Sequence, residues 1–339
     1  MTVKVLIDHN LPFLLAHGGL QIQIERTKAA LEHHGVEVEY LRWFDEDQRG
    51  DIIHFFGRAA PSHIRFAQGK GMKYVMSDLL TGQGSRPASL LRLQAALNRC
   101  FETLMPPVFR DMPRWSSYRE ADAVLAVTPY EAKLMRQLFR ADPARLHVVT
   151  VGIDELFFAD RPEACGDYLI STATIHPRKR NLETARAALT AGVSMVFTGK
   201  PYSEDDPYFM EFRKLVAENP GRLTYVGFLP ARADLAEAYR KARGFVLLST
   251  MESLSASALE AVAAGCPLLL SDLPWARDTF GADATYCGAT DAGGMARALR
   301  EFYEAAPRLP LPVRPPTWLE VGGQIRDIYR AITGATRAA

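Results

Sequence analysis

The chain has 339 residues, of which 48% are hydrophobic and 23% are charged; at about 150 residues per domain, this predicts a folded protein of two domains. Its 40 lysines and arginines nearly balance 39 aspartates and glutamates, and a net charge of +1 argues against a dedicated nucleic-acid-binding protein. The chain shows no run of about 18 apolar residues and no secretory leader pattern, so we expect a cytoplasmic protein without a transmembrane helix.

Short apolar segments alternate with segments of helical periodicity in the first half of the chain. The segment at 20–34 has apolar residues at helical spacing and is followed by Gly35, which predicts a helix with a glycine after its end. The expected strands lie at 3–7, 36–40, 51–55, 73–76, 123–127 and 147–151. Strands that alternate with helices predict right-handed crossovers and a parallel sheet.

The same alternation begins again after a polar stretch at 158–167. The expected strands of this half lie at 168–171, 194–198, 223–226, 244–248 and 267–271. A proline-rich run at 307–316 then leads into an amphipathic helix at 318–332. We therefore expect an α/β protein with two Rossmann-like, doubly wound domains at 1–160 and 161–312 and a terminal segment at 313–339.

Several chemistries lack their sequence signatures. The segment GQGSRP at 82–87 lacks the third glycine of a dinucleotide-binding turn, and SMVFTGKP at 194–201 lacks the first glycine of a P-loop. Neither a G-x-S-x-G nucleophile motif nor an H-E-x-x-H zinc motif occurs. The four cysteines form no C-x-x-C pair, so we expect no zinc knuckle and no dithiol centre.

The segment TMESLSASALEAVAAGCP at 250–267 is the most informative one. It follows a buried strand, and either Ser253 or Ser255 can cap a helix that stops at Gly265. The start of such a helix favours an anion such as a diphosphate. Glu252 lies at this mouth, and Glu260 lies two turns into the helix, where a carboxylate can accept both hydroxyls of a ribose diol.

The two glutamates and the following AVAAGCP resemble the nucleotide-sugar motif of the retaining family 4 (group 1) glycosyltransferases of the GT-B fold. The glycine pair 18–19, VGID at 151–154, VGFL at 226–229 and a closing helix with Trp318 and Tyr329 resemble further parts of that family, in the same order. The resemblance implies the GT-B architecture, in which two domains face each other across a cleft and the C-terminal helix returns to the N-terminal domain.

The resemblance also implies roles for this segment. Glu260 would hold the ribose, and Glu252 would face the transferred sugar. The backbone N–H groups of Ser253, Leu254 and Ser255 would face the phosphates.

A basic segment, IHPRKRNL at 175–182, follows the first strand of the second half. Departure of a nucleoside diphosphate develops negative charge, which fixed cations stabilise. By the resemblance, Lys179 fits the catalytic lysine of the family best, with Arg180 in a competing register. Thr174 stands where the family has an arginine, and Arg178 is a candidate substitute.

The loops after the next two strands complete the expected donor site. Gly199 and Lys200 are expected at the edge of the cleft. Phe228 and Leu229 are expected to flank the nucleotide base, which Gly227 allows the backbone to approach.

The N-terminal half is expected to bind the acceptor. In this half we assign acceptor binding to His9, Asn10 and Gly18, and donor binding to Gly19. Ser77 stands where the family often has a histidine, beside Asp78. If that histidine assists the reacting sugar in the family, Asp78, His9 or another group takes its role in this chain.

Leucines and a phenylalanine form one helical stripe within residues 86–119, at positions 90, 93, 97, 101 and 104. The same segment holds six arginines and two acidic residues. One interpretation is peripheral contact with anionic lipid or an anionic acceptor. The other is a surface helix whose apolar face packs into the core.

The resemblance thus implies a metal-independent glycosyltransferase that uses a nucleotide-sugar as donor substrate and needs no other cofactor. We expect it to be cytoplasmic, at the inner membrane surface if the stripe binds lipid, and a monomer or a homodimer. The acceptor remains open among glycans, lipids and small molecules. The alternatives are another GT-B sugar-nucleotide enzyme, such as an epimerase or a phosphorylase, and a degenerate nucleotide-sugar-binding protein.

Overall fold

The computed structural model describes residues 3–14, 19–160, 162 and 166–334, without the side chains of residues 107 and 108. The chain forms two compact units. The N-terminal unit comprises Met1–Gly152 together with Pro316–Ala339, and the C-terminal unit comprises Ile153–Pro315. The boundaries expected at 160 and 312 lie near these divisions.

The N-terminal unit is built on a six-stranded sheet with the order β2-β1-β3-β4-β5-β6, in which every pair of neighbours is parallel. Its strands are β1 (Lys4–His9), β2 (Glu37–Tyr40), β3 (Ile52–Phe56), β4 (Lys73–Ser77), β5 (Ala123–Ala126) and β6 (Leu146–Val148). The order reverses between β1 and β3, so the loops after these two strands part there and leave room for a ligand.

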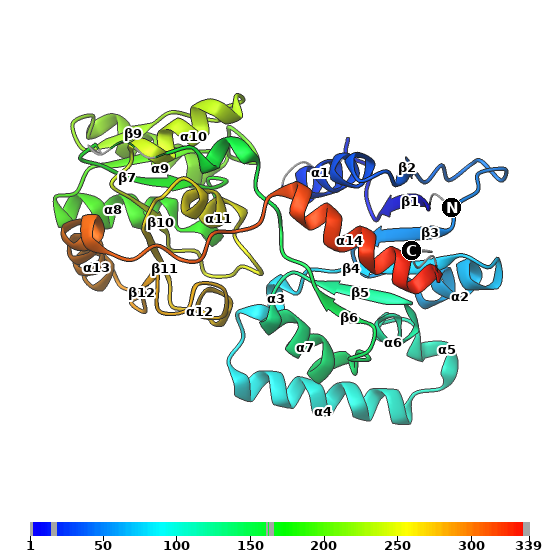
Figure 1. Ribbon diagram of the computed structural model, residues 1–339. Helices are drawn as coiled ribbons and strands as arrows, with labels where there is room; N and C mark the ends of the chain where they lie inside the picture. The colour runs from blue at the N-terminus through cyan, green and yellow to red at the C-terminus, as the bar shows by residue number, and fades with distance from the viewer. Residues whose placement is uncertain (1–2, 15–18, 161, 163–165, 335–339) are drawn as a thin grey trace. The chain divides into compact units, whose positions relative to one another are not determined.

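Helices cover both faces of this sheet (Figure 1). On one face, α1 (Gly19–His33) and α14 (Trp318–Thr333) share a core with β1. On the other face, α2 (Pro61–Gly69), α4 (Ala88–Leu104) and α7 (Pro129–Phe139) share a core with β3 and β4. Short helices α3 (Thr81–Gly84), α5 (Pro107–Arg110) and α6 (Ser117–Glu120) lie in the connections.

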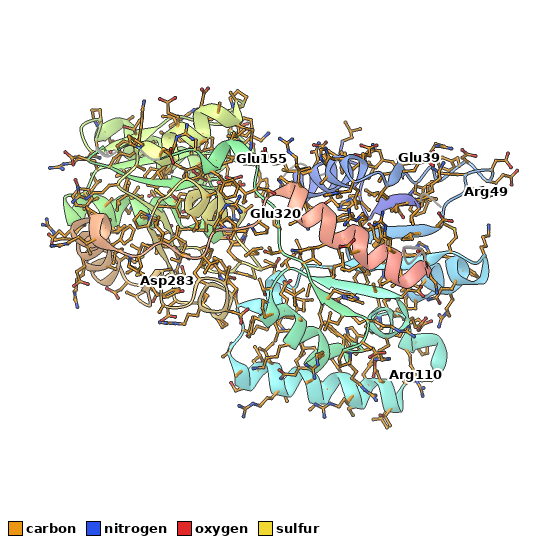
Figure 2. The ribbon with its side chains drawn as sticks, viewed as in Figure 1. Glu39, Arg49, Arg110, Glu155, Asp283 and Glu320 are labelled. Atoms are coloured by element: carbon orange, nitrogen blue, oxygen red, sulfur yellow. The ribbon has the colours of Figure 1, made fainter. Side chains whose placement is uncertain are left out.

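The terminal helix α14 begins at a capping box. Thr317 N–H donates to the Glu320 carboxylate (2.6 Å), and Glu320 N–H donates to the Thr317 hydroxyl (3.2 Å); Glu320 is labelled in Figure 2. A Cβ at Gly322 would lie 2.7 Å from the Cβ of Ala30, so glycine permits the close approach of α14 to α1. The expectation that the C-terminal helix returns to the N-terminal domain is confirmed.

The C-terminal unit is built on a second six-stranded parallel sheet, with the order β12-β11-β10-β7-β8-β9. Its strands are β7 (Leu169–Thr172), β8 (Met195–Thr198), β9 (Leu223–Tyr225), β10 (Gly244–Leu247), β11 (Leu268–Ser271) and β12 (Thr285–Cys287). Its helices are η1 (Glu155–Phe158), η2 (Pro177–Lys179), α8 (Asn181–Ala191), α9 (Pro207–Glu218), α10 (Arg232–Lys241), α11 (Ala256–Ala263), α12 (Pro274–Phe280), α13 (Ala292–Ala305) and η3 (Ala306–Arg308).

Both faces of this sheet are also covered. Helices α8, α9 and α13 form a large core with Leu169 of β7, Met195 and Phe197 of β8 and Val246 of β10. On the opposite face, Tyr239 of α10 packs against Phe245 of β10, with ring centroids 5.9 Å apart. Burial on both faces explains why strands such as β11 are continuous apolar runs. The eleven strands expected from the sequence are present, and β12 is an additional one.

Helix α4 corrects one expectation. Its buried residues are Leu91, Ala95 and Asn98, whereas the leucines at 90, 93, 97 and 104 are between 43% and 70% exposed. The interpretation that places this leucine stripe in the core is therefore wrong. Figure 1 shows α4 on the outside of the unit, against α7.

Candidate active site

The strand order of the C-terminal unit reverses between β7 and β10, which lie side by side. In doubly wound sheets, the loops that follow the two strands at such a point diverge and form a crevice that binds ligands. Here these loops are the basic segment 173–180 after β7 and the segment 248–255 after β10. They contain the residues that the sequence assigned to catalysis in this unit.

A buried cluster of opposite charges joins the two loops. Arg178 Nη1 lies 3.0 Å from Glu252 Oε1, and Lys179 Nζ donates to the same oxygen. The side chains of Lys179 and Glu252 are only 12% and 8% exposed. Burial lowers the pKa of the Lys179 ammonium, and the Glu252 carboxylate opposes that shift. The structure thus brings Arg178, Lys179 and Glu252 together, as the sequence predicted for one site.

Backbone contacts fix the geometry of this cluster. Arg178 Nη1 also donates to the Met251 carbonyl (2.8 Å), and Thr250 N–H donates to the Arg178 carbonyl (2.8 Å). His176 caps the short helix η2 by accepting from Arg178 N–H (3.1 Å). Arg180 adopts the left-handed conformation (φ 52°) and immediately precedes α8. Lys179, rather than Arg180, therefore contacts Glu252.

Helix α11 starts after this cluster. Ser255 is its N-cap and accepts from Ala258 N–H (3.2 Å), which decides between the two serines that the sequence offered. Ser253 and Ser255 are buried and Leu254 is half-buried. The N-cap of α11 follows Glu252 by three residues in the chain, so the helix end that carries a partial positive charge comes directly after the cluster in the sequence.

Glu260 belongs to a second buried network. Its Oε1 accepts from Arg232 Nη2 (2.6 Å), and its Oε2 accepts from the Tyr239 hydroxyl (3.3 Å). Arg232 Nε also donates to Asp154 (3.1 Å), and the guanidinium lies 4.8 Å from the ring centroid of Phe157. Burial raises the pKa of the Glu260 carboxyl, and Arg232 opposes this shift. The network orients the carboxylate that the sequence assigned to a ribose.

Sequence reasoning missed Arg232 and Tyr239. Arg232 opens α10, a strongly polar helix, and nothing in its neighbourhood distinguishes it from the other surface arginines. Tyr239 has the spacing of an ordinary core residue of that helix. The contacts of both residues with Glu260 depend on how α10 packs against α11.

The loops after β8 and β9 lie along the same edge of the sheet. Gly199 has φ +137°, and a Cβ there would be 2.0 Å from the Ala173 carbonyl oxygen, so only glycine fits. Lys200 is exposed, with its ammonium 5.6 Å from the ring centroid of Phe228, which is itself 61% exposed. Leu229 is half-buried. Their assigned contacts with the donor stay a prediction.

The N-terminal unit has its own pocket at the carboxyl ends of β1, β3 and β4, with a volume of about 470 Å³. Asn10 and Asp78 line it together with Arg58. His9 lines a neighbouring, mostly apolar pocket, and Gly19 is the exposed first residue of α1. Gly18 lies outside the described residues.

The carboxylate of Asp78 accepts from the Tyr118 hydroxyl and from Arg58 Nε (3.2 Å). The phenol, which is buried, has its pKa raised first by this burial and then by Asp78. Arg58 Nε also donates to the Tyr118 oxygen (3.0 Å), so the three groups form a closed triangle. Sequence reasoning singled out Asp78 but neither of its partners.

A histidine does lie close to Ser77, from the adjacent strand. His54 Nε2 is 2.7 Å from the Ser77 hydroxyl oxygen, and His54 Nδ1 is 2.6 Å from the hydroxyl oxygen of Tyr329 in α14. His54 is fully buried, and burial lowers its pKa to about 3, so the imidazole is neutral. It therefore connects the terminal helix to the end of β4 rather than serving as an exposed acid or base.

Across the described part of the chain, no group of three or more His, Cys, Asp or Glu side chains could hold a metal ion. Within the same residues, no helix has the length and apolar content needed to cross a bilayer.

Comparisons with known proteins give a family match within the C-terminal unit. Residues 172–310 match the family model of the group 1 glycosyl transferases. The D-inositol 3-phosphate glycosyltransferase of Mycobacterium avium (strain 104) is 31% identical over 175 residues, which are 48% of this chain and 41% of that protein. Its counterpart in Mycobacterium marinum (strain ATCC BAA-535 / M) is 30% identical over 176 residues, which are 48% and 38% of the two chains. The chain thus covers about two fifths of the curated relatives it matches.

Solved structures match over nearly the whole chain. Sucrose-phosphate synthase from Thermosynechococcus elongatus has a TM-score of 0.68 at 16% identity, covering 99% of this chain and 100% of that one. Anabaena HepE in complex with UDP has a TM-score of 0.69 at 13% identity, covering 98% and 100%. The chain therefore has the GT-B fold, and its residues 172–310 match the model of the group 1 glycosyl transferases.

Proposed function

We propose that this chain transfers a sugar from a nucleoside diphosphate sugar to an acceptor, with retention of the anomeric configuration as in the family 4 enzymes. The observation that carries the proposal is the cluster of Arg178 with the largely buried Lys179 and Glu252 at the reversal of the strand order. The names of the relatives support the reaction class. Structures of HepE with UDP and with UDP-glucose make UDP the first nucleotide to test.

In this reaction, the bond between the anomeric carbon and a diphosphate oxygen breaks, a bond to an acceptor oxygen forms, and the proton of the acceptor hydroxyl passes to the departing diphosphate. Arg178 and Lys179 would stabilise the negative charge that develops on the departing diphosphate. Burial lowers the pKa of Lys179, and Glu252 opposes this shift and contacts the ammonium. Glu252 would also face the transferred sugar. Because the chain supplies these fixed cations, we propose that the reaction needs no metal ion.

The remaining donor contacts follow the same edge of the sheet. Glu260, held by Arg232 and Tyr239, would accept from the ribose hydroxyls with its remaining lone pairs. The N–H groups at the start of α11 would face the phosphates. The further residues proposed to contact the donor are Arg180, Gly199, Lys200, Phe228, Leu229 and Gly19. Asn10 and His9 would contact the acceptor.

Nucleotide binding and turnover test this proposal. We expect one of UDP, GDP, ADP and dTDP to raise the thermal unfolding temperature, because a ligand that binds only the folded state stabilises it. Lys179→Met should lower the rate of sugar transfer about 100-fold or more. Lys214→Met is the matched control, since the Lys214 side chain is 74% exposed in the same unit, and it should leave the rate unchanged.

The products distinguish the alternatives. A transferase releases a nucleoside diphosphate and forms a glycoside whose anomeric configuration, read by proton NMR, equals that of the donor. Conversion of the sugar within the nucleotide would instead indicate an epimerase, and a requirement for inorganic phosphate would indicate a phosphorylase. Binding of a nucleotide-sugar without turnover over a broad acceptor panel would show a binding protein and would refute the proposed activity.

We also propose that α4 places the protein on the cytoplasmic face of an anionic membrane. Its exposed leucines at 90, 93, 97 and 104 lie on the same helix as the exposed Arg92 and Arg99. The acidic residue of this helix, Glu102, is paired with Arg119 (2.9 Å). Arg92 and Arg99 lie on the opposite side of the helix from the leucine ridge, and the described part of the helix carries no acidic side chain besides Glu102. An apolar ridge on a helix of net positive charge suits an anionic lipid surface.

Vesicle binding tests this surface. The protein should cosediment with vesicles containing phosphatidylglycerol and should dissociate at high salt. Replacing Leu93 and Leu97 by Gln should abolish binding, whereas Val313→Gln, at an 87% exposed position of the other unit, should not. Absence of vesicle binding, or a dimer in light scattering that the leucine substitutions convert to a monomer, would overturn the proposal.

A further inference from the structure

The pocket at the carboxyl ends of β1, β3 and β4 has a chemistry that the proposed transfer reaction does not by itself require. It is lined by two arginines, Arg58 and Arg114, and by a single carboxylate, that of Asp78. The carboxylate is already engaged by Tyr118 and by Arg58. The lining therefore presents a net positive charge to whatever occupies the pocket.

Arg58 is held so that its outer end faces a ligand. Both of its hydrogen bonds to Asp78 and Tyr118 leave from Nε, at 3.2 and 3.0 Å. The guanidinium carbon lies 5.2 Å from the ring centroid of Tyr118 and 4.7 Å from that of Phe139, which fixes its plane. Within the described residues, the two terminal nitrogens thus keep their N–H groups for a ligand. Nearby negative charge raises the pKa of Arg58 although burial opposes it, so the cation is permanent.

Arg114 brings a second guanidinium to the same wall. Its backbone has φ +58°, a conformation that a non-glycine residue adopts at some cost, and its Nη1 donates to the Arg58 carbonyl (3.0 Å). The side chain is exposed on its other side. Two guanidinium groups in the lining of one pocket suit the oxygens of a phosphate group.

The rest of the lining suits hydroxyl groups. The Ser77 hydroxyl is oriented by His54 (2.7 Å). The amide of Asn10 lies against Gly57, where a Cβ would be 2.5 Å from Asn10 Nδ2 and where φ is +125°. A volume of about 470 Å³ accommodates a phosphorylated sugar or polyol.

We infer that this pocket binds the acceptor through a phosphate group, so that the acceptor is a phosphorylated sugar or polyol. Arg58 and Arg114 hold the phosphate, and Asp78 with Tyr118 positions Arg58. Asn10 and Ser77 contact the hydroxyl groups. The inference rests on the proposed transferase function, because it names the substrate that receives the sugar.

Direct binding provides the first test and does not depend on turnover. Isothermal titration with glycerol 3-phosphate, glucose 6-phosphate and inositol 1-phosphate should show binding to at least one of them. The corresponding unphosphorylated compounds should bind at least ten times more weakly. Titration with a short-chain phosphatidylinositol distinguishes a lipid headgroup from a soluble phosphorylated compound as the acceptor. If the acceptor is a lipid, the phosphatidylinositol should bind more tightly than the soluble compounds.

Substitutions assign the binding to this pocket. Arg114→Gln should weaken binding of the phosphorylated compound about 10- to 100-fold, because it removes charge-assisted hydrogen bonds. Arg136→Gln is the matched control, at an exposed arginine of the same unit, and should have no effect. Arg58→Lys keeps the positive charge but loses the two terminal guanidinium nitrogens that can bind a phosphate together, and it should also weaken binding. Loss of the thermal unfolding transition would reveal a variant that does not fold. Because the Arg114 side chain is exposed, Arg114→Gln provides a test that is independent of Arg58→Lys.

The outcomes separate this inference from the proposed function. Equal binding of phosphorylated and unphosphorylated compounds, or an unchanged affinity in Arg114→Gln, would overturn the phosphate pocket while nucleotide-sugar turnover remained. Failure to bind any nucleotide, with the phosphate pocket intact, would instead overturn the transferase function. Binding of phosphate compounds that every variant retains would place the phosphate elsewhere and would likewise overturn the inference.

Discussion

The buried His54 makes the stability of the N-terminal unit depend on pH. The unfolded chain binds a proton at this residue below pH 6.5, its ordinary pKa, whereas burial lowers the pKa in the folded protein to about 3. Acid therefore favours the unfolded state, and the stability that is complete above pH 6.5 falls as the pH drops towards 3. At pH 5.0, 1.5 pH units below 6.5, the loss from this residue is about 2 kcal/mol.

Replacement by glutamine isolates this effect. Urea unfolding of the wild type and of His54→Gln at pH 7.5 and pH 5.0 gives four free energies of unfolding. The variant is expected to be less stable at both pH values, because the contacts to Ser77 and Tyr329 change. The decrease in the free energy of unfolding from pH 7.5 to pH 5.0 should nevertheless be about 2 kcal/mol smaller in the variant than in the wild type. His33→Gln, at an exposed histidine of the same unit, should keep the wild-type loss. Equal losses in wild type and His54→Gln would refute the reasoning.

Three further substitutions test other parts of the structure. Gly199→Ala should lower the unfolding free energy by about 1–3 kcal/mol in thermal or urea unfolding, because its Cβ meets a carbonyl oxygen at a positive φ; Gly221→Ala, with nothing within 4 Å, should be nearly neutral. Thr317→Ala should cost about 1 kcal/mol through loss of the capping box of α14, and an unchanged unfolding midpoint would show that the cap does not matter. Glu260→Ala should abolish the rise in unfolding temperature caused by the nucleotide, and an undiminished rise would remove Glu260 from the donor site.

The local pattern of the sequence predicted the strands and the loops that hold the site. Buried parallel strands are short apolar runs, and each such run is recognisable without knowledge of its neighbours. The loops after β7 and β10 could therefore be located from the sequence, and with them Arg178, Lys179 and Glu252. The choice of Lys179 over Arg180 as the partner of Glu252 required coordinates, because a left-handed residue at 180 turns the chain there.

Side-chain partners far apart in the chain could not be predicted in the same way. Arg232 reaches Glu260 across 28 residues, and His54 reaches Tyr329 across 275. Hydrophobic periodicity does not predict such pairs, because each pair depends on how two helices or strands pack in the same unit. The leucine stripe of α4 is a related case, because helical spacing shows that apolar residues share a face but not whether that face is covered.

The amino-acid sequence by itself determined the two α/β units, the succession of their parallel strands and the helix that closes the chain, because hydrophobic periodicity and capping residues act within a few positions of the chain. Only the tertiary structure decided which charges meet: Glu252 with two cations, Glu260 with Arg232, and Asp78 with Arg58. The physical reason is that an ion pair is stabilised by proximity and burial, and both are properties of the packed chain rather than of any one segment.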